Sequence, residues 1–260
     1  MIRFSFALAG TPTIAASTTF ADSVHPATNV LLPLRPHLRA YSANLSAQRL
    51  TLDLGAATSL AVIGLGHVNF ATATIQGNAT DAWGAPTYSQ AITIGRSPNT
   101  RYQHNHRPTV AVPFNLRHVS LSIPNQATTD GAAVFRVGYL FAAGVIVSPP
   151  RNIQAAPDEE NEEARADTET ADGRRVQRLV FDDPTWHVIA RRLAETEAEI
   201  AAWREIDRQW SGATGQAALV MMDDAFPEET WIMRQVSISK WQHKPFWSES
   251  EMELREVTAG

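Results

Sequence analysis

The sequence of 260 residues contains no cysteine, so neither disulfide bonds nor thiolate metal sites can stabilise the fold. Its basic residues form no cluster and its formal net charge is −5, whereas a general nucleic-acid binder needs a basic surface. No apolar run approaches the roughly 20 residues that a membrane helix requires. These absences predict a protein with no nucleic-acid specificity and no membrane insertion.

Catalytic motifs are missing as well. The sequence has no G-x-S-x-G elbow, no H-E-x-x-H, no phosphate-binding loop and no G-x-G-x-x-G. Adjacent carboxylates on a strand point to opposite faces, so none of the three doublets makes a glycosidase pair by itself: Asp182-Asp183, Asp223-Asp224 and Glu228-Glu229. We therefore expect no enzyme, no catalytic residue and no cofactor.

One pair of histidines has the spacing of metal ligands. His104 and His106 stand at positions i and i+2, which place two side chains on the same face of a strand. No third ligand is near, and Arg101 and Arg107 beside them would repel a cation. We expect a polar loop or a subunit contact here, and no metal.

The composition divides the chain into parts. With 44% hydrophobic residues, 260 residues suffice for one large domain or two modest ones. Acidic residues and tryptophans are scarce before Pro149-Pro150, whereas six of the seven tryptophans follow Gly173. We predict a β-sandwich over residues 1–150, an acidic linker over 151–174 and an α+β domain over 175–260. Residues 1–9 are expected to form a first strand, with a weak signal peptide as the alternative.

The first part has the pattern of an all-β domain. Short runs of β-branched and apolar residues alternate with clusters of Asn, Gly, Pro and Ser, as in a sandwich or jelly roll. The expected strands are 50–54, 59–63, 72–75, 91–94, 109–114, 119–123 and 133–141. The fold class is therefore predicted to be mainly β.

The linker prediction rests on the segment APDEENEEARADTETAD, residues 156–172. It is strongly acidic and has no apolar periodicity, which is typical of a solvated loop. The alternative is a strap that docks on a basic partner.

The last part is predicted to be a sheet crossed by one long helix. After a strand at 176–181, Asp183 and Pro184 have the pattern of a helix cap followed by a proline at the first helical position. Apolar residues then recur at helical spacing along about seven turns: Trp186, Ile189, Leu193, Ile200, Trp203, Ile206 and Trp210. Three strands are expected to follow, at 217–222, 231–241 and 250–257.

The stretch LTLDLGAATSLAVIGLGHVNF, residues 50–70, contains two apolar runs around a glycine. Asp53 and Gly55 suit a turn in which the carboxylate accepts backbone N–H groups and the glycine takes a positive φ. His67 and Asn69 come just after the second run, where they are expected to hydrogen-bond the loop that closes over the strand ends. A structural role is favoured for His67 over ligand binding.

This stretch resembles the galactose-binding-like, or discoidin-like, sandwich modules in tail proteins of long-tailed bacteriophages. Those modules read as an aliphatic-Asp-Leu-Gly turn followed by an aliphatic strand that ends in Gly-His-Asn, and here Val68 is inserted between the His and the Asn. The likeness continues through FRVGYLFAAGVIVSPPRN, residues 135–152, and spans most of 25–152. The last part is similar in layout to tail-tube-like and distal-tail domains, although the order of the two domains departs from many distal tail proteins.

The resemblance implies a structural protein of a phage tail tip or baseplate, such as a distal or minor tail protein. It would assemble in the host cytoplasm as a trimer or hexamer ring with other tail proteins, and would reside in the virion tail. Candidate assembly contacts, at even odds with ordinary core, are Met233, Trp241, Phe246 and Trp247.

Two other functions remain open. The first is a carbohydrate-binding module that recognises a host surface glycan, with candidate contacts at Trp83, Tyr88 and Tyr102. The second is a hydrolase of cell-wall or capsule sugars, for which the sequence offers no motif.

Overall fold

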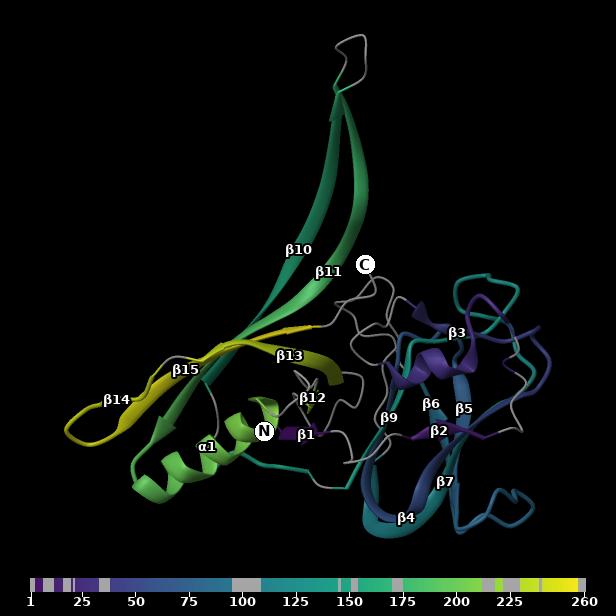
Figure 1. Cartoon of the computed structure of the whole chain (residues 1–260), viewed down its shortest axis with the longest axis horizontal. Helices are drawn as coiled ribbons and strands as arrows, with labels where there is room; N and C mark the ends of the chain where they lie inside the picture. The colour runs from purple at the N-terminus through teal and green to yellow at the C-terminus, as the bar shows by residue number, and fades with distance from the viewer. Residues whose placement is uncertain are drawn as a thin grey trace.

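The chain forms two large sheets and one helix in a computed structural model (Figure 1). The structure describes residues 3–6, 12–15, 20, 22–32, 38–94, 109–144, 146–150, 154–169, 175–211, 218–221, 230–238 and 240–256. Strands far outnumber helical segments among these residues, so the mainly β prediction is confirmed. No helix in this part of the chain is long and apolar enough to cross a membrane.

The first large sheet comes from the N-terminal half. Its strand order is β2-β4-β7-β5-β6, and β9 pairs with the second half of β4. The bounds are β2 Thr13–Ile14, β4 Gln48–Gly66, β5 Thr72–Asn78, β6 Tyr88–Thr93, β7 Thr109–Ile123 and β9 Tyr139–Ala143. A small second layer contains β3 (Ala40–Tyr41) paired with β8 (Arg136–Val137), and the short 3-10 helix η1 (Ala27–Leu31). One apolar core joins residues of the sheet to residues of this layer, including Val30 and Phe135.

Strand β4 differs from the prediction of two strands around a turn. It runs without interruption from residue 48 to 66, and the glycine turn is a bulge within it. Its pairing with β7 passes from Asp53↔His118 to Thr58↔Leu116, so four residues of β4 oppose one of β7. The first half of β4 then pairs with β2 and the second half with β9, which lets one strand serve two parts of the sheet.

The second large sheet has the order β1-β12-β13-β15-β11-β10, with β14 paired to β15. The bounds are β1 Arg3–Phe6, β10 Gln154–Glu169, β11 Arg175–Ala194, β12 Ala218–Met221, β13 Thr230–Ile238, β14 Gln242–His243 and β15 Ser248–Glu256. The first strand, β1, thus pairs with β12 of the C-terminal sheet, although it was expected within the N-terminal sandwich. Strand β12 begins at Ala218, far along the chain from β1, so no local sequence pattern predicts that the two strands pair.

The helix is shorter than predicted. Helix α1 spans Glu197–Ser211, whereas residues 175–194, including Trp186 and Ile189, belong to strand β11. The true start is a capping box, because Thr196 Oγ1 accepts the N–H of Glu199 at 3.2 Å and Glu199 Oε2 accepts the N–H of Glu195 at 2.6 Å. Pro184 is accommodated in β11 because that part of the strand pairs on one side only among the described strands.

The acidic linker prediction is wrong for residues 154–169. They form strand β10, which pairs antiparallel with β11 from Gln154↔Arg191 to Glu169↔Arg175. β15 accompanies β11 only from His187 to Ala194, so residues 158–169 and 175–186 pair with each other beyond the end of the sheet. Figure 1 shows this two-stranded ribbon projecting far from both sheets. We call these two segments the arm.

Strand β13 is covered on both faces by the same chain. Met233 lies in a core with Trp203, Ile206 and Trp210 of α1. Ile232, on the opposite face, packs with Val62 of β4 and with residues of β9, which joins the two large sheets. The apolar character of both faces of this strand is therefore explained without another subunit.

Candidate functional site

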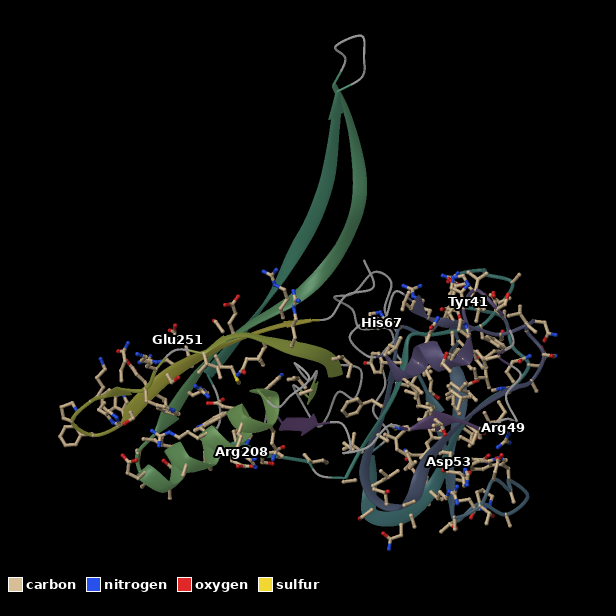
Figure 2. The ribbon with its side chains drawn as sticks, in the orientation of Figure 1. Tyr41, Arg49, Asp53, His67, Arg208 and Glu251 are labelled. Atoms are coloured by element: carbon tan, nitrogen blue, oxygen red, sulfur yellow. The ribbon has the colours of Figure 1, made fainter. Side chains whose placement is uncertain are left out.

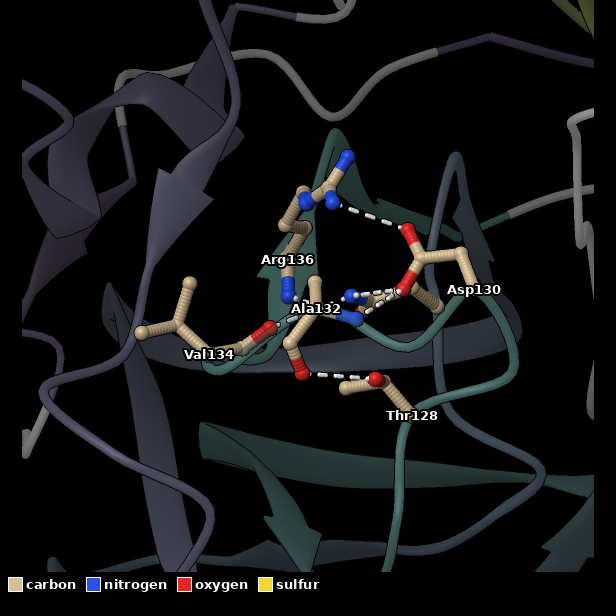
Figure 3. Close-up of polar contacts among 6 residues, drawn as sticks. Thr128, Asp130, Ala132, Val134 and Arg136 are labelled. Carbon is tan, nitrogen blue, oxygen red and sulfur yellow. Dashed lines mark hydrogen bonds and ion pairs between the residues drawn. The ribbon is translucent and has the colours of Figure 1, made fainter.

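Asn69 fixes the loop that follows β7. Its Nδ2 donates to Asp130 Oδ1 and to the Val134 carbonyl, both at 3.1 Å, and its Oδ1 accepts the N–H of Arg136 at 2.8 Å. Figure 3 shows the rest of the network, in which Arg136 pairs with Asp130 at 2.9 Å and Thr128 donates to the Ala132 carbonyl at 2.7 Å. These hydrogen bonds of Asn69 are all to groups of the same chain, so its role is structural.

His67 is buried at the end of β4. Its φ of 54° lies in the left-handed region, and its ring meets Tyr139 edge-on at 5.8 Å between centroids. A Cβ placed on Gly138 would lie 2.5 Å from His67 Cβ, so only glycine fits beside it. Burial lowers the pKa of His67 to about 3, with a further contribution from the positive charge of Arg39. The imidazole is therefore neutral at pH 7 and has no access to a ligand.

Asp53 holds the bulge of β4. Arg117 donates to both of its oxygens, through Nε at 2.9 Å and Nη2 at 3.0 Å, and the N–H of Gly55 donates to Oδ1 at 2.8 Å. The hydrogen bond from Arg117 and the one from Gly55 hold the pKa of Asp53 down at about 2. Gly55 has a φ of 80°. A carboxylate occupied in this way is a turn element and not a catalytic acid.

A polar network lies on the outer face of the first sheet. Arg49 Nη1 donates to Gln76 Oε1 at 2.9 Å and to Ser120 Oγ at 3.1 Å, and its guanidinium lies 5.1 Å from the centre of the Trp83 ring. Burial lowers the pKa of Arg49. Trp83 Nε1 in turn donates to Asp81 Oδ1 at 2.7 Å. Figure 2 marks Arg49 and Asp53 on this sheet.

Trp83 and Tyr88, two of the three aromatic residues considered as candidate glycan contacts, are not brought together. Tyr88 alternates with Ile92 on β6 and therefore shares the face that packs on the core, where its hydroxyl contacts Gln90. Trp83 contacts Arg49 on the opposite face of the sheet. Tyr102 lies outside the described residues.

Most of the metal and carboxylate candidates lie on residues that the structure does not describe. His104, His106 and the doublets at 223–224 and 228–229 lie outside the described residues, while Asp182 and Asp183 lie in the arm. Within the described ranges, no group of three or more His, Asp or Glu side chains is placed to hold a metal ion.

Two of the four expected assembly contacts belong to the core of the chain. Met233 is fully buried. Trp241 is partly buried and lies 5.1 Å from the guanidinium of Arg192, a wholly buried cation that the sequence analysis did not single out. Arg192 Nη1 donates to Asp207 of α1 at 2.7 Å and Nη2 to Ser250 at 2.6 Å.

The other two contacts lie at the end of the β14–β15 hairpin, where they are open to solvent. Phe246 is 82% exposed and Trp247 is 42% exposed. The turn between them and β14 is closed by the N–H of Lys244, which donates to the Trp247 carbonyl at 2.8 Å. Lys240 and Lys244 are the only lysines of the chain. We call residues 240–247, which contain no carboxylate, the cationic tip.

The arm has the opposite charge. Residues 158–169 and 175–186 contain nine carboxylates and three arginines, an excess of six negative charges that is larger than the net −5 of the whole chain. The register places Glu162 directly opposite Asp183 and Glu163 opposite Asp182. Directly opposed like charges destabilise a strand pair, so these two positions carry an electrostatic cost.

No protein-family model and no curated protein matches the sequence. Among solved structures, the chain is similar to a chitosan-binding module of a chitosanase/glucanase from Paenibacillus sp. IK-5, with 17% identity over 55% of this chain and 99% of the module, at a TM-score of 0.40. The family 32 carbohydrate-binding module of Clostridium perfringens NanJ, in complex with galactose, gives 10% identity over 55% and 98%, also at 0.40. The N-terminal domain of the single-strand break repair protein XRCC1 gives 12% over 54% and 98%, at 0.39. Similarities at this level do not indicate a ligand or an activity for this chain.

Proposed function

We propose that the chain is a non-enzymatic structural component of a phage tail tip or baseplate, and that it acts by assembling with copies of itself and with other tail proteins. The observation that carries the assembly role is the arm, a ribbon of two 12-residue segments without a third strand among the described residues. At about 3.3 Å per residue, the ribbon extends about 40 Å from the sheet. The phage context rests on the sequence resemblance of residues 25–152.

A ribbon of this kind needs a partner to be stable. Two strands alone in water are marginally stable at best, because they bury little apolar surface. The arm adds opposed carboxylates at Glu162↔Asp183 and Glu163↔Asp182. A partner that covers the ribbon and neutralises these charges removes both costs.

Other surfaces of the C-terminal sheet are already occupied. Helix α1 covers the face that contains Met233, and strands β4 and β9 cover the face that contains Ile232. We therefore place the contacts with other chains on the arm and on the exposed residues of the cationic tip.

Removing the arm is expected to abolish assembly. Replacing residues 159–186 with Asn-Gly would join the Asp158↔His187 pair by a two-residue hairpin turn and leave the rest of β10 and β11 in place. Light scattering over a concentration series should give the full chain a mass of at least three times 28.5 kDa, and the shortened chain the mass of a monomer. A full chain that stays monomeric at every concentration would contradict the proposed assembly.

A second candidate function is carbohydrate recognition by the first sheet, favoured by the exposed side of the Arg49–Trp83–Asp81 network. An indole beside a carboxylate and a guanidinium offers an apolar face and hydrogen-bond partners for a sugar. If this is correct, Trp83→Ala weakens galactose binding in calorimetry at least tenfold, whereas Trp247→Ala in the cationic tip leaves it unchanged. Equal affinity of the two variants, or no heat with the unmodified chain, would rule the site out.

A further inference from the structure

We propose that the cationic tip of one copy docks on the acidic arm of a second copy. This inference rests on the proposed assembly function and names its contact. The partner is thus another copy of this chain, and the surfaces that meet are residues 240–247 on one side and residues 158–169 with 175–186 on the other.

The cationic tip has the properties of a surface that docks on another chain. Phe246 is the most exposed large apolar side chain of the described residues, and Trp247 is beside it. Aromatic residues of this kind are enriched in interface cores. Both lysines of the chain lie within eight residues, Lys240 exposed to solvent and Lys244 in a 3.4 Å ion pair with Glu249. The tip therefore combines apolar surface with a rim of positive charge.

The arm has the complementary properties. Its register opposes acidic residues to acidic residues in the middle of the ribbon, and its nine carboxylates exceed its three arginines by six charges, which favours a cationic partner. Among the residues that the structure describes, strand β10 is the last strand of its sheet and pairs with β11 alone, which leaves its other edge without a described strand. A cation seated near residues 162–163 and 182–183 lowers the repulsion within the ribbon.

The geometry favours a second copy over a contact within one chain. Figure 1 shows the β14–β15 hairpin and the arm leaving the C-terminal sheet in different directions, with their ends far apart. The chain outside the arm has a net charge of about +1, and the tip places both lysines of the chain in a segment without carboxylates, which suits the negative charge of the arm. Because tip and arm are different surfaces, the contact is heterologous and each copy can offer one of each. Successive contacts of this kind close into a ring or continue as a filament.

The test uses charge reversal with a matched control. In the full chain, Lys240→Glu and Phe246→Ser should each raise the concentration at which oligomers form by at least tenfold in light scattering. Arg208→Glu changes the charge by the same amount on the outer side of α1, where the side chain is 76% exposed, and should leave assembly unchanged. Oligomers that form equally well in all three variants would overturn the contact while leaving assembly itself in place.

Reversing the charge of the arm distinguishes loss of the contact from loss of the fold. Glu162→Lys with Glu163→Lys removes the opposed carboxylates and should strengthen the ribbon, yet it is expected to abolish assembly because the tip then meets like charge. Adding Lys240→Glu and Lys244→Glu to the same chain should restore assembly at low salt. Failure of this restoration would contradict the contact, as would a monomeric chain whose tip binds phosphatidylserine vesicles. Monomers in every variant and in the unmodified chain would instead contradict the assembly function.

Discussion

Replacing Asp207 with alanine is expected to lower the free energy of unfolding by about 3–5 kcal/mol, because it leaves the Arg192 guanidinium charged and buried without its counter-ion. Arg192 is 0% exposed, and its Nη1 donates to both oxygens of Asp207, at 2.7 and 2.9 Å. The rings of Trp203 and Trp241 lie 5.4 and 5.1 Å from the guanidinium. Urea unfolding at pH 7 and low protein concentration, followed by tryptophan fluorescence, measures the loss.

Two controls show whether burial of the charge is the cause. Glu205→Ala breaks another carboxylate–arginine pair on the same helix, but Arg208 and Glu205 are solvent-exposed, so no measurable loss is expected. Adding Arg192→Met to Asp207→Ala removes the buried charge and should recover most of the stability. A loss with Glu205→Ala as large as that with Asp207→Ala, or a double variant no more stable than the single one, would contradict this explanation.

Lowering the pH from 7 to 5 is expected to cost about 2 kcal/mol of unfolding free energy through His67. Its pKa is about 3 in the folded chain, because the ring is buried, and about 6.5 when unfolded. The unfolded state therefore binds the proton first, so the stabilisation is complete above about pH 6.5 and is lost as the pH falls toward 3. Asp53 has its folded pKa at about 2, so its contribution changes only below about pH 4.

His67→Asn provides the control for this pH dependence. Asparagine tolerates the left-handed φ of 54° and does not titrate. The variant should lose most of the difference between urea unfolding at pH 7 and at pH 5, even if it is less stable at both. An unchanged difference would show that another group is responsible.

The strands were largely predictable from the sequence because their signal is local. Alternation of apolar residues over 50–54, 72–75 and 119–123 falls within β4, β5 and β7. The arm was not predictable, since a strand rich in consecutive acidic residues has no apolar face and its backbone hydrogen bonds depend on β11. The same pairing turned residues 184–194 into strand, although Asp183-Pro184 and the spacing of Trp186 and Ile189 favour a helix. The Thr196/Glu199 capping box was the local signal that marked the true start.

The candidate site was predictable in part. Phe246 and Trp247 were identified as candidate contacts, and the structure leaves both exposed. For Met233 the sequence left an assembly contact and ordinary core equally open, because periodicity shows that a strand has two apolar faces but does not show what covers them; the structure buries this residue. Tyr88 and Trp83 are five residues apart in the sequence. Tyr88 lies on the face of the first sheet that packs on the core, whereas Trp83 lies against Arg49 on the opposite face. Arg192 was missed because a lone arginine among many has no pattern that reveals its burial.

Hydrogen exchange of the arm at two protein concentrations tests most directly whether the arm is the element of assembly. In dilute protein, the amides of residues 158–169 and 175–186 should exchange quickly, because a ribbon of two strands opens readily. In concentrated protein they should become at least tenfold more protected, while the amides of β4 and β7 stay as they were. Arm amides that exchange at the same rate at both concentrations, although light scattering shows oligomers, would contradict the account.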